Sequence, residues 1–139
     1  MLKIRYIILI FCFLSAGVVV SAQTTSKQQQ RKNLTIKEWN TNASTNTRYL
    51  DHVTTYNEKG QKVEEIEYAN YGQKYRITFE YNEQGKCVKQ IEFDAKNKVA
   101  HIRTFEYDAN GRKSKQYNYL PNGKLETTKV FEYITSPEK

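Results

Sequence analysis

The sequence predicts an all-β fold: an antiparallel meander of about 7–8 strands, built from tandem hairpin repeats, with little helix. From residue 56 onward an aromatic residue recurs every 12 to 14 positions, and a glycine or asparagine follows four positions after each of the first six aromatics. Between these turns, apolar and polar residues alternate as they do in half-buried strands. No segment after residue 22 has a helical period. We therefore expect one twisted or curled sheet.

Residues 1–22 have the features of a secretory signal peptide. Lys3 and Arg5 precede an unbroken apolar run, and Val20 and Ala22 are small residues at the third and first positions before a cut. The apolar stretch 6–20 is shorter than the roughly 20 residues that cross a bilayer. We therefore expect cleavage, no membrane span afterwards, and export to the periplasm, the outer surface or the medium.

The charge and the cysteines limit the classes of partner. Loss of Lys3 and Arg5 takes Lys+Arg from 22 to 20 against 15 acidic residues, which leaves +5 spread along the chain. A nucleic-acid binder concentrates such charge on one face, so no nucleic-acid partner is expected. Only Cys87 remains after cleavage, which rules out an intramolecular disulfide. This thiol is most simply a small core or edge residue; an intermolecular disulfide or a reactive thiol is the alternative.

Residues 23–33 are polar without an apolar period and predict a flexible linker. Residues 34–139 are expected to form one domain. Leu34, Ile36 and Trp39 mark a short strand-like segment, and the turn formers of residues 40–47 predict an exposed loop.

The repeat covers residues 49–133. Its aromatics are Tyr56, Tyr68, Tyr81, Phe93, Tyr107, Tyr119 and Tyr133, and the residues four positions after the first six are Gly60, Gly72, Gly85, Asn97, Gly111 and Gly123. The intervals sum in pairs to 25 or 26, so the repeating unit contains two strands. Asparagine is the other residue that readily accepts a positive φ. Each loop is therefore predicted to be a type I turn followed by a positive-φ residue, with Pro121 at a central turn position.

The strand patterns alternate with one irregularity. Tyr75, Ile77 and Phe79 share one face, as strict alternation requires. The shorter strands instead place apolar residues three apart, as in Val63 and Ile66. Either the first residue of such a pair points to the opposite face, or a bulge restores the register; recurrent bulges would curl the sheet.

The stretch 107–112, Tyr-Asp-Ala-Asn-Gly-Arg, resembles the Tyr-Asp-x-x-Gly-Arg core of tyrosine-aspartate (YD, or RHS-type) repeats, and 56–61 and 81–86 are looser versions. The chain also resembles small exported hairpin-repeat proteins of Bacteroidetes-type genomes. In RHS proteins many hairpins wind into a shell around a toxin, and three double units are too few for that. The resemblance thus implies hairpin geometry and transfers no catalytic residues.

The apolar face of such a sheet must be covered. The sheet can curl on itself, pack the segment of Leu34, Ile36 and Trp39 over this face, or dimerise. Aliphatic residues are sparse, so the core should consist largely of tyrosine rings, which bury the ring and keep the hydroxyl in water.

The titratable residues do not predict a reaction centre, a metal site or a cofactor. Glutamates recur before the aromatics and alternate with Lys and Arg, which favours cross-strand ion pairs over a pair of catalytic carboxylates; they are Glu67, Glu80, Glu92, Glu106 and Glu132. His52 and His101 have no second ligand at metal-binding spacing.

We therefore expect an exported, non-enzymatic repeat protein, a protein–protein interaction or structural module of the cell envelope, with another protein or its own copy as partner. The alternative is glycan binding through Trp39 and Tyr71, aromatics that lie outside the repeated column. A hydrolase with a dispersed carboxylate site is the least favoured class.

Overall fold

The protein forms a single eight-stranded antiparallel sheet in a computed structural model, which describes residues 27–135. Each strand pairs with its neighbours in the chain, in the order β1 to β8, and the sheet does not close, so the predicted meander is confirmed. The predicted signal peptide, 1–22, lies outside the described residues. The strands are β1 Thr35–Thr41, β2 Arg48–Tyr56, β3 Lys62–Ala69, β4 Gly72–Tyr81, β5 Cys87–Phe93, β6 Val99–Tyr107, β7 Lys113–Tyr119 and β8 Leu125–Val130.

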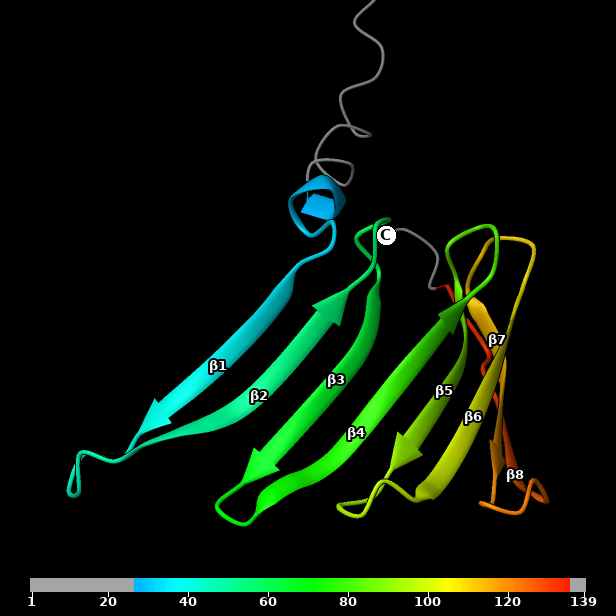
Figure 1. Cartoon of the computed structure of the whole chain (residues 1–139). Helices are drawn as coiled ribbons and strands as arrows, with labels where there is room; N and C mark the ends of the chain where they lie inside the picture. The colour runs from blue at the N-terminus through cyan, green and yellow to red at the C-terminus, as the bar shows by residue number, and fades with distance from the viewer. Residues whose placement is uncertain (1–26, 136–139) are drawn as a thin grey trace, which may run out of the picture.

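The sheet curls along its length (Figure 1). β1 to β4 are seen face-on, whereas β5 to β8 turn away until they are seen almost edge-on, and β1 and β8 form the two open margins. The turns β2–β3, β4–β5 and β6–β7 lie at the end of the sheet drawn uppermost, which we call the upper end.

Five of the six repeated turns have the predicted loop. In the β2–β3 turn, Gly60 donates its backbone N–H to the carbonyl of Asn57 at 2.9 Å, and the Asn57 carboxamide oxygen accepts from the backbone of Lys59 and Gln61. The side chain thus holds the reversal while the positive-φ residue completes it. The corresponding φ values lie between 57° and 82° at Gly60, Gly85, Asn97, Gly111 and Gly123.

The turn between β3 and β4 is different, and the prediction of the same loop at Gly72 is wrong. Ala69 pairs directly with Gly72, which leaves Asn70 and Tyr71 as a two-residue loop, and φ of Gly72 is 114°. This hairpin is tighter because its strands remain paired up to the reversal, and Tyr71 therefore occupies the loop tip.

A β-bulge follows every one of these six turns, on the strand that leaves the turn. The register shifts where the aromatic column is reached, for example between Glu80 and Tyr81. Such bulges increase twist, so their repetition accounts for the curl predicted from the strand patterns. The extra residue at each bulge has no residue directly opposite it on the preceding strand; these residues are Val63, Lys74, Val88, Ala100, Ser114 and Glu126.

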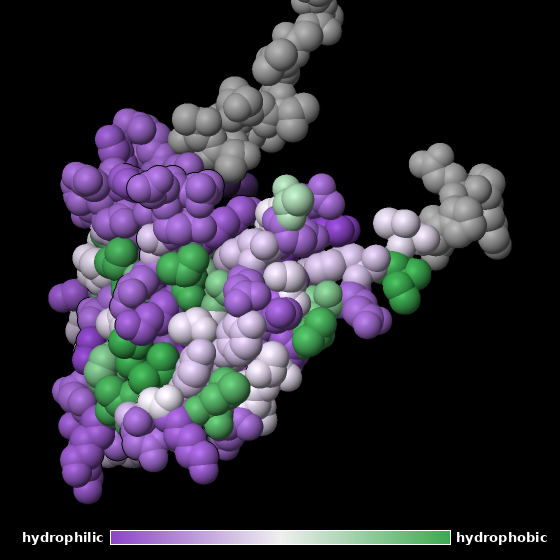
Figure 2. Space-filling view, turned by 90° about the vertical axis from the view of Figure 1, so that its right-hand side faces the viewer, coloured by the Kyte–Doolittle hydropathy of each residue, from purple (hydrophilic) through white to green (hydrophobic). Residues whose placement is uncertain are grey.

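Apolar residues occupy both faces of the sheet, which corrects the expectation of one apolar face. The register places Phe79 and Phe105 on one face and Ile91 and Ile102 on the other. The first explanation of the three-residue spacing holds, because Val88 lies with Phe105 on one face and Ile91 lies on the other. The bulge is at Val88 itself and not between the two residues, so it does not bring them to one face. Figure 2 accordingly shows apolar side chains in separate groups, divided by hydrophilic ones.

Few side chains are fully shielded from water. Among the described residues, the buried side chains are Val53, Phe105 and Thr54, at 9%, 7% and 6% exposure, and Gly60 is buried as well. Most other residues of β2 to β7 are half-buried, which fits a thin sheet of tyrosine rings.

Residues 27–33 belong to the predicted flexible linker, but residues 27–30 form one helical turn over the upper end of the sheet. Asn33 donates its backbone N–H to the carbonyl of Asn57 at 3.0 Å, and a Cβ built on Gly60 would meet the Gln28 carbonyl oxygen. The described part of this segment is therefore packed against the β2–β3 turn. No helix within residues 27–135 is long and apolar enough to span a bilayer.

Candidate functional surfaces

Tyrosine hydroxyls tie the strands together at the upper end. Each of three repeat tyrosines donates its hydroxyl hydrogen to a carbonyl at the start of the preceding strand: Tyr81 to Lys62 at 2.7 Å, Tyr107 to Cys87 at 2.7 Å and Tyr133 to Lys113 at 2.8 Å. Burial raises the pKa of Tyr81 to about 12 and also raises the pKa of Tyr107. These hydroxyls stay protonated and act as structural donors.

Two open hollows repeat at this end, one double unit apart. The first, of about 480 Å³, lies between Val63, Phe79 and Tyr81 beside the β2–β3 turn. The second, of about 760 Å³, is built from the equivalent Val88, Phe105 and Tyr107 beside the next two turns. Each hollow is lined by a valine, a phenylalanine and a tyrosine at equivalent positions of the repeat.

Cationic side chains lie over these rings. The Lys62 ammonium is 5.6 Å from the Phe79 ring centroid, and that of Lys113 is 3.9 Å from the Phe105 centroid. Lys86 lies 5.7 Å from the Tyr107 ring and also donates to the Gly111 carbonyl at 3.0 Å. These cations use the ring faces, so the cation–π contacts add to the sheet's own cohesion.

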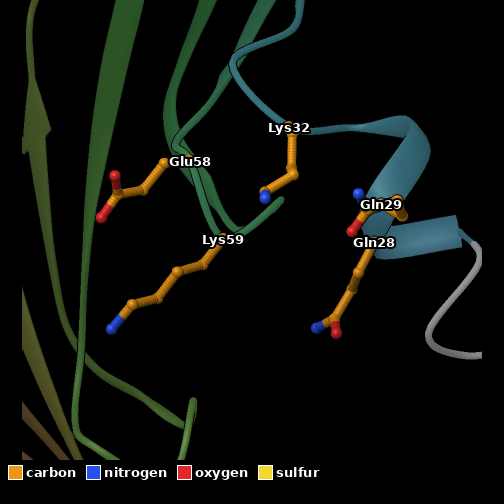
Figure 3. A pocket seen from close by; sticks show the side chains of 5 residues that line it. All are labelled: Gln28, Gln29, Lys32, Glu58 and Lys59. Atoms are coloured by element: carbon orange, nitrogen blue, oxygen red, sulfur yellow. The ribbon is translucent and has the colours of Figure 1, made fainter.

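A third hollow, of about 340 Å³, separates the N-terminal helical turn from the β2–β3 turn (Figure 3). Gln28, Gln29 and Lys32 line one side and Glu58 and Lys59 the other. The side chains of Glu58 and Lys59 extend away from the helical turn, so the five polar groups do not converge on one point.

Four of the five repeated glutamates form the cross-strand pairs that the sequence predicts: Glu67, Glu80, Glu92 and Glu106. Glu80 binds Lys89 at 3.1 Å, Glu92 binds Arg103 at 2.9 Å and Glu106 lies 3.8 Å from Lys115. These carboxylates face cations on the next strand.

Glu67 has a second kind of partner. It accepts hydrogen bonds from Lys74 at 2.9 Å and from the Tyr75 hydroxyl at 2.5 Å. The Tyr75 hydrogen bond is the main cause that lowers the pKa of Glu67, and the same bond raises the pKa of Tyr75 to about 12. Both groups keep their ordinary protonation states at neutral pH.

The two histidines lie apart, each beside a glutamate. His52 Nε2 is 3.6 Å from Glu65, and His101 Nδ1 is 3.7 Å from Glu92. Within residues 27–135 no three His, Cys, Asp or Glu side chains are grouped to hold a metal ion.

Cys87 begins β5 and is half-buried. Its thiol donates to the Lys89 carbonyl at 3.5 Å, and burial raises its pKa. A thiol whose pKa is raised carries less thiolate at neutral pH and is a weaker nucleophile. This environment is that of the small edge-of-core residue that the sequence favours.

The predicted aromatics Trp39 and Tyr71 do not form a common platform. Trp39 lies on the edge strand β1 with the Arg48 guanidinium 4.5 Å from its ring, whereas Tyr71 is at the β3–β4 loop tip and is 70% exposed. β2 and β3 lie between them.

Exposed large apolar side chains gather at the two open edges. Among the described residues, the β1 side has Leu34, Ile36 and Trp39, and the β8 side has Leu125, Val130, Tyr133 and Ile134. Every residue of β1 and of β8 is exposed. Sequence reasoning missed the β8 side, because its residues continue the repeat and nothing in a repeat distinguishes its last copy.

Comparison with known proteins adds no family. No family model and no curated protein matches the chain. Among solved structures, the chain is similar to a point mutant of S. aureus TarM in complex with fondaparinux, α-GlcNAc-glycerol and UDP. The identity is 16%, the TM-score is 0.29, and the match covers 73% of this chain and 20% of TarM. At that TM-score the likeness carries no argument about fold or activity.

Proposed function

We propose that this chain is an exported, non-enzymatic interaction module of the cell envelope that binds protein through the open edges of its sheet. The export part of the proposal rests on the signal-peptide features of residues 1–22. The binding part rests on one observation, the concentration of exposed apolar side chains along β1 and β8.

An open edge presents unpaired backbone donors and acceptors, to which another strand can add. The β8 edge adds Val130 and Ile134, which are 62% and 90% exposed. Single exposed apolar residues are ordinary on protein surfaces, but a row of them along an unpaired strand supports a binding role.

The test is affinity capture from the native envelope with the processed protein as bait. The matched variants are Val130→Pro, which removes one outward backbone N–H from β8, and Val130→Thr, which keeps it. We expect a partner that the wild type and Val130→Thr retain and that Val130→Pro loses. Capture that is equal with all three baits would refute binding through the β8 edge, and no capture would refute binding through either edge.

Glycan binding is a second candidate, favoured by the 70% exposure of Tyr71 at the β3–β4 loop tip. An aromatic ring in that position can stack on a sugar. Retardation in polysaccharide affinity gels should then fall for Tyr71→Ala, with Trp39→Ala as a comparison. Unretarded migration of the wild type on every polysaccharide would eliminate this candidate.

A further inference from the structure

The β1 edge matches the β8 edge in the order of the repeat, because β1 has the apolar spacing of the odd-numbered strands. Its Ile36 and Trp39 are three residues apart, as are Val63 and Ile66 in β3 and Val88 and Ile91 in β5. Within the sheet every even-numbered strand except β8 pairs with the odd-numbered strand that follows it in the chain. A second copy's β1 is therefore the strand that would continue the repeat beyond β8.

The ion pairs define a register for this contact. Glu80 in β4 and Glu106 in β6, each directly before a repeat tyrosine, bind Lys89 and Lys115 on the following odd strand. Glu132 directly precedes Tyr133 and so occupies the same position beyond β8.

The matching lysine is present on β1. Lys89 lies two residues before Ile91, and Lys37 lies two residues before Trp39. Glu132 and Lys37 are thus unlike charges at equivalent positions on the two edges.

The backbone directions agree with this register. Phe131 donates its N–H to Ser114 in β7 at 3.0 Å, so its neighbours Val130 and Glu132 direct theirs to the open edge. On the other edge, Leu34 accepts from Tyr56 in β2 at 2.8 Å.

Backbone groups alternate between the two sides of a strand. Lys37 and Trp39 are three and five residues after Leu34, so their backbone groups point away from β2, to the open edge. Pairing Glu132 with Lys37 therefore also pairs Val130 with Trp39, and all four backbones point into the contact, as a ladder requires. Val130 and Trp39 are 62% and 46% exposed, and each would cover the other.

We propose that copies of this protein associate head to tail, with the β8 edge of one copy adding to the β1 edge of the next in the register Glu132–Lys37. This deepens the proposed function and rests on it, since it names the partner of both edges. The contact is heterologous, so copies joined in an open chain leave a free β8 at one end and a free β1 at the other, and such a chain grows past a dimer. Only closure into a ring would use both edges of every copy.

Sedimentation velocity of the purified processed protein over a wide concentration range tests the proposal. The weight-average mass should rise with concentration past that of a dimer. Val130→Pro should sediment as a monomer, while Val130→Thr should still associate.

Charge reversal tests the register. Lys37→Glu alone and Glu132→Lys alone each place like charges opposite one another and should weaken association by up to about tenfold. An equimolar mixture of the two variants restores unlike charges at the contact between them and should recover association toward the wild-type mass. Lys124→Glu and Glu83→Lys, exposed turn residues that change the net charge equally, should have little effect.

A monomer at every concentration would overturn the proposal, as would an assembly that tolerates both reversals or a mixture of the two variants that does not recover association. If the pure protein stays monomeric while the envelope capture retains a different protein in a Val130-dependent way, head-to-tail association fails and the proposed function stands. If the capture also fails, both fall.

Discussion

At the scale of single residues, the upper end of the sheet is held by groups that repeat every second strand. Tyr107 donates to the Cys87 carbonyl, and Asp108, the next residue, organises the turn that follows. Each of these two side chains makes a small number of defined hydrogen bonds, so a conservative substitution can isolate its contribution to the stability of the fold.

Tyr107→Phe should lower the free energy of unfolding by about 0.5–1.5 kcal/mol, because it removes one hydrogen bond and leaves the Cys87 carbonyl without that donor. Urea unfolding followed by tyrosine fluorescence or far-UV CD measures the change. Tyr71→Phe, at the exposed loop tip, should change the same quantity by less than about 0.5 kcal/mol. Equal losses in both variants would contradict a specific role for the Tyr107 hydroxyl.

Asp108→Asn should reduce the loss of stability in acid. The backbone N–H of Arg112, followed by its side chain, lowers the pKa of Asp108 below that of the unfolded chain. The carboxylate therefore stabilises the fold above the unfolded pKa, and this contribution is lost as pH falls through the lower, folded pKa.

Asparagine keeps the acceptor oxygen of the turn, as Asn57 and Asn82 already do, but does not titrate in this range. Thermal unfolding midpoints measured from pH 7 down to pH 2 should fall less steeply for Asp108→Asn than for the wild type. Asp94→Asn should act alike, since backbone N–H groups also lower the pKa of Asp94. Parallel curves for the wild type and both variants would show that the turns do not contribute to acid sensitivity.

At the scale of elements, five of the six repeated hairpins combine a positive-φ residue with a bulge three residues later, and the β3–β4 hairpin is the exception. The glycines share a backbone conformation but not their surroundings. Gly123 has open space where a Cβ would be placed, whereas a Cβ on Gly60 would meet the backbone carbonyl of Gln28.

Gly123→Ala should cost about 1–2 kcal/mol in unfolding free energy, which is the penalty of a left-handed conformation for a residue with a Cβ. Gly60→Ala carries the same penalty and must also displace the helical turn of residues 27–30. Hydrogen exchange of residues 27–33 should therefore accelerate in Gly60→Ala and stay unchanged in Gly123→Ala. Unchanged exchange in both would mean that the helical turn does not depend on this contact.

At the scale of the whole molecule, the sheet behaves as a one-dimensional array in which each strand contacts only its neighbours. Stability in such arrays is approximately a sum of unit and interface contributions. The double unit is the element that can be removed without changing the direction of any strand.

Deletion of residues 83–108 should give a folded six-stranded sheet. It joins Asn82 to Ala109 and so rebuilds an Asn-x-x-Gly turn, and it brings Glu80 opposite Lys115, the equivalent of Lys89. The urea m-value should fall by about a quarter, in line with the surface removed. Deletion of the single-strand unit 82–93 mismatches the strand types and should not fold cooperatively; comparable folding of both deletions would contradict the two-strand unit.

The sequence alone was sufficient for five of the six repeated turns and for the two-strand period, and it placed the strand number at about 7–8, where the structure has eight. Four of the six turns start with an Asn or Asp whose side chain holds the reversal, and each has its positive-φ residue three positions later; they start at Asn57, Asn82, Asp94 and Asp108. Asp and Asn act through side-chain hydrogen bonds to the backbone of their own turn, and Gly acts through its positive φ, so no tertiary information is needed.

The tertiary structure alone decided which face each apolar residue occupies and where the surface is left open. Val88 is the bulged residue of β5, and the residues after it pair with β4 in a shifted register, so the register decides that Ile91 lies on the face opposite Phe79. The exposure of Val130 likewise follows from its place on the last strand, since its equivalent in an inner strand, Thr104, is half-buried. Edges are a property of the assembled sheet, because a strand becomes an edge only when nothing pairs beside it.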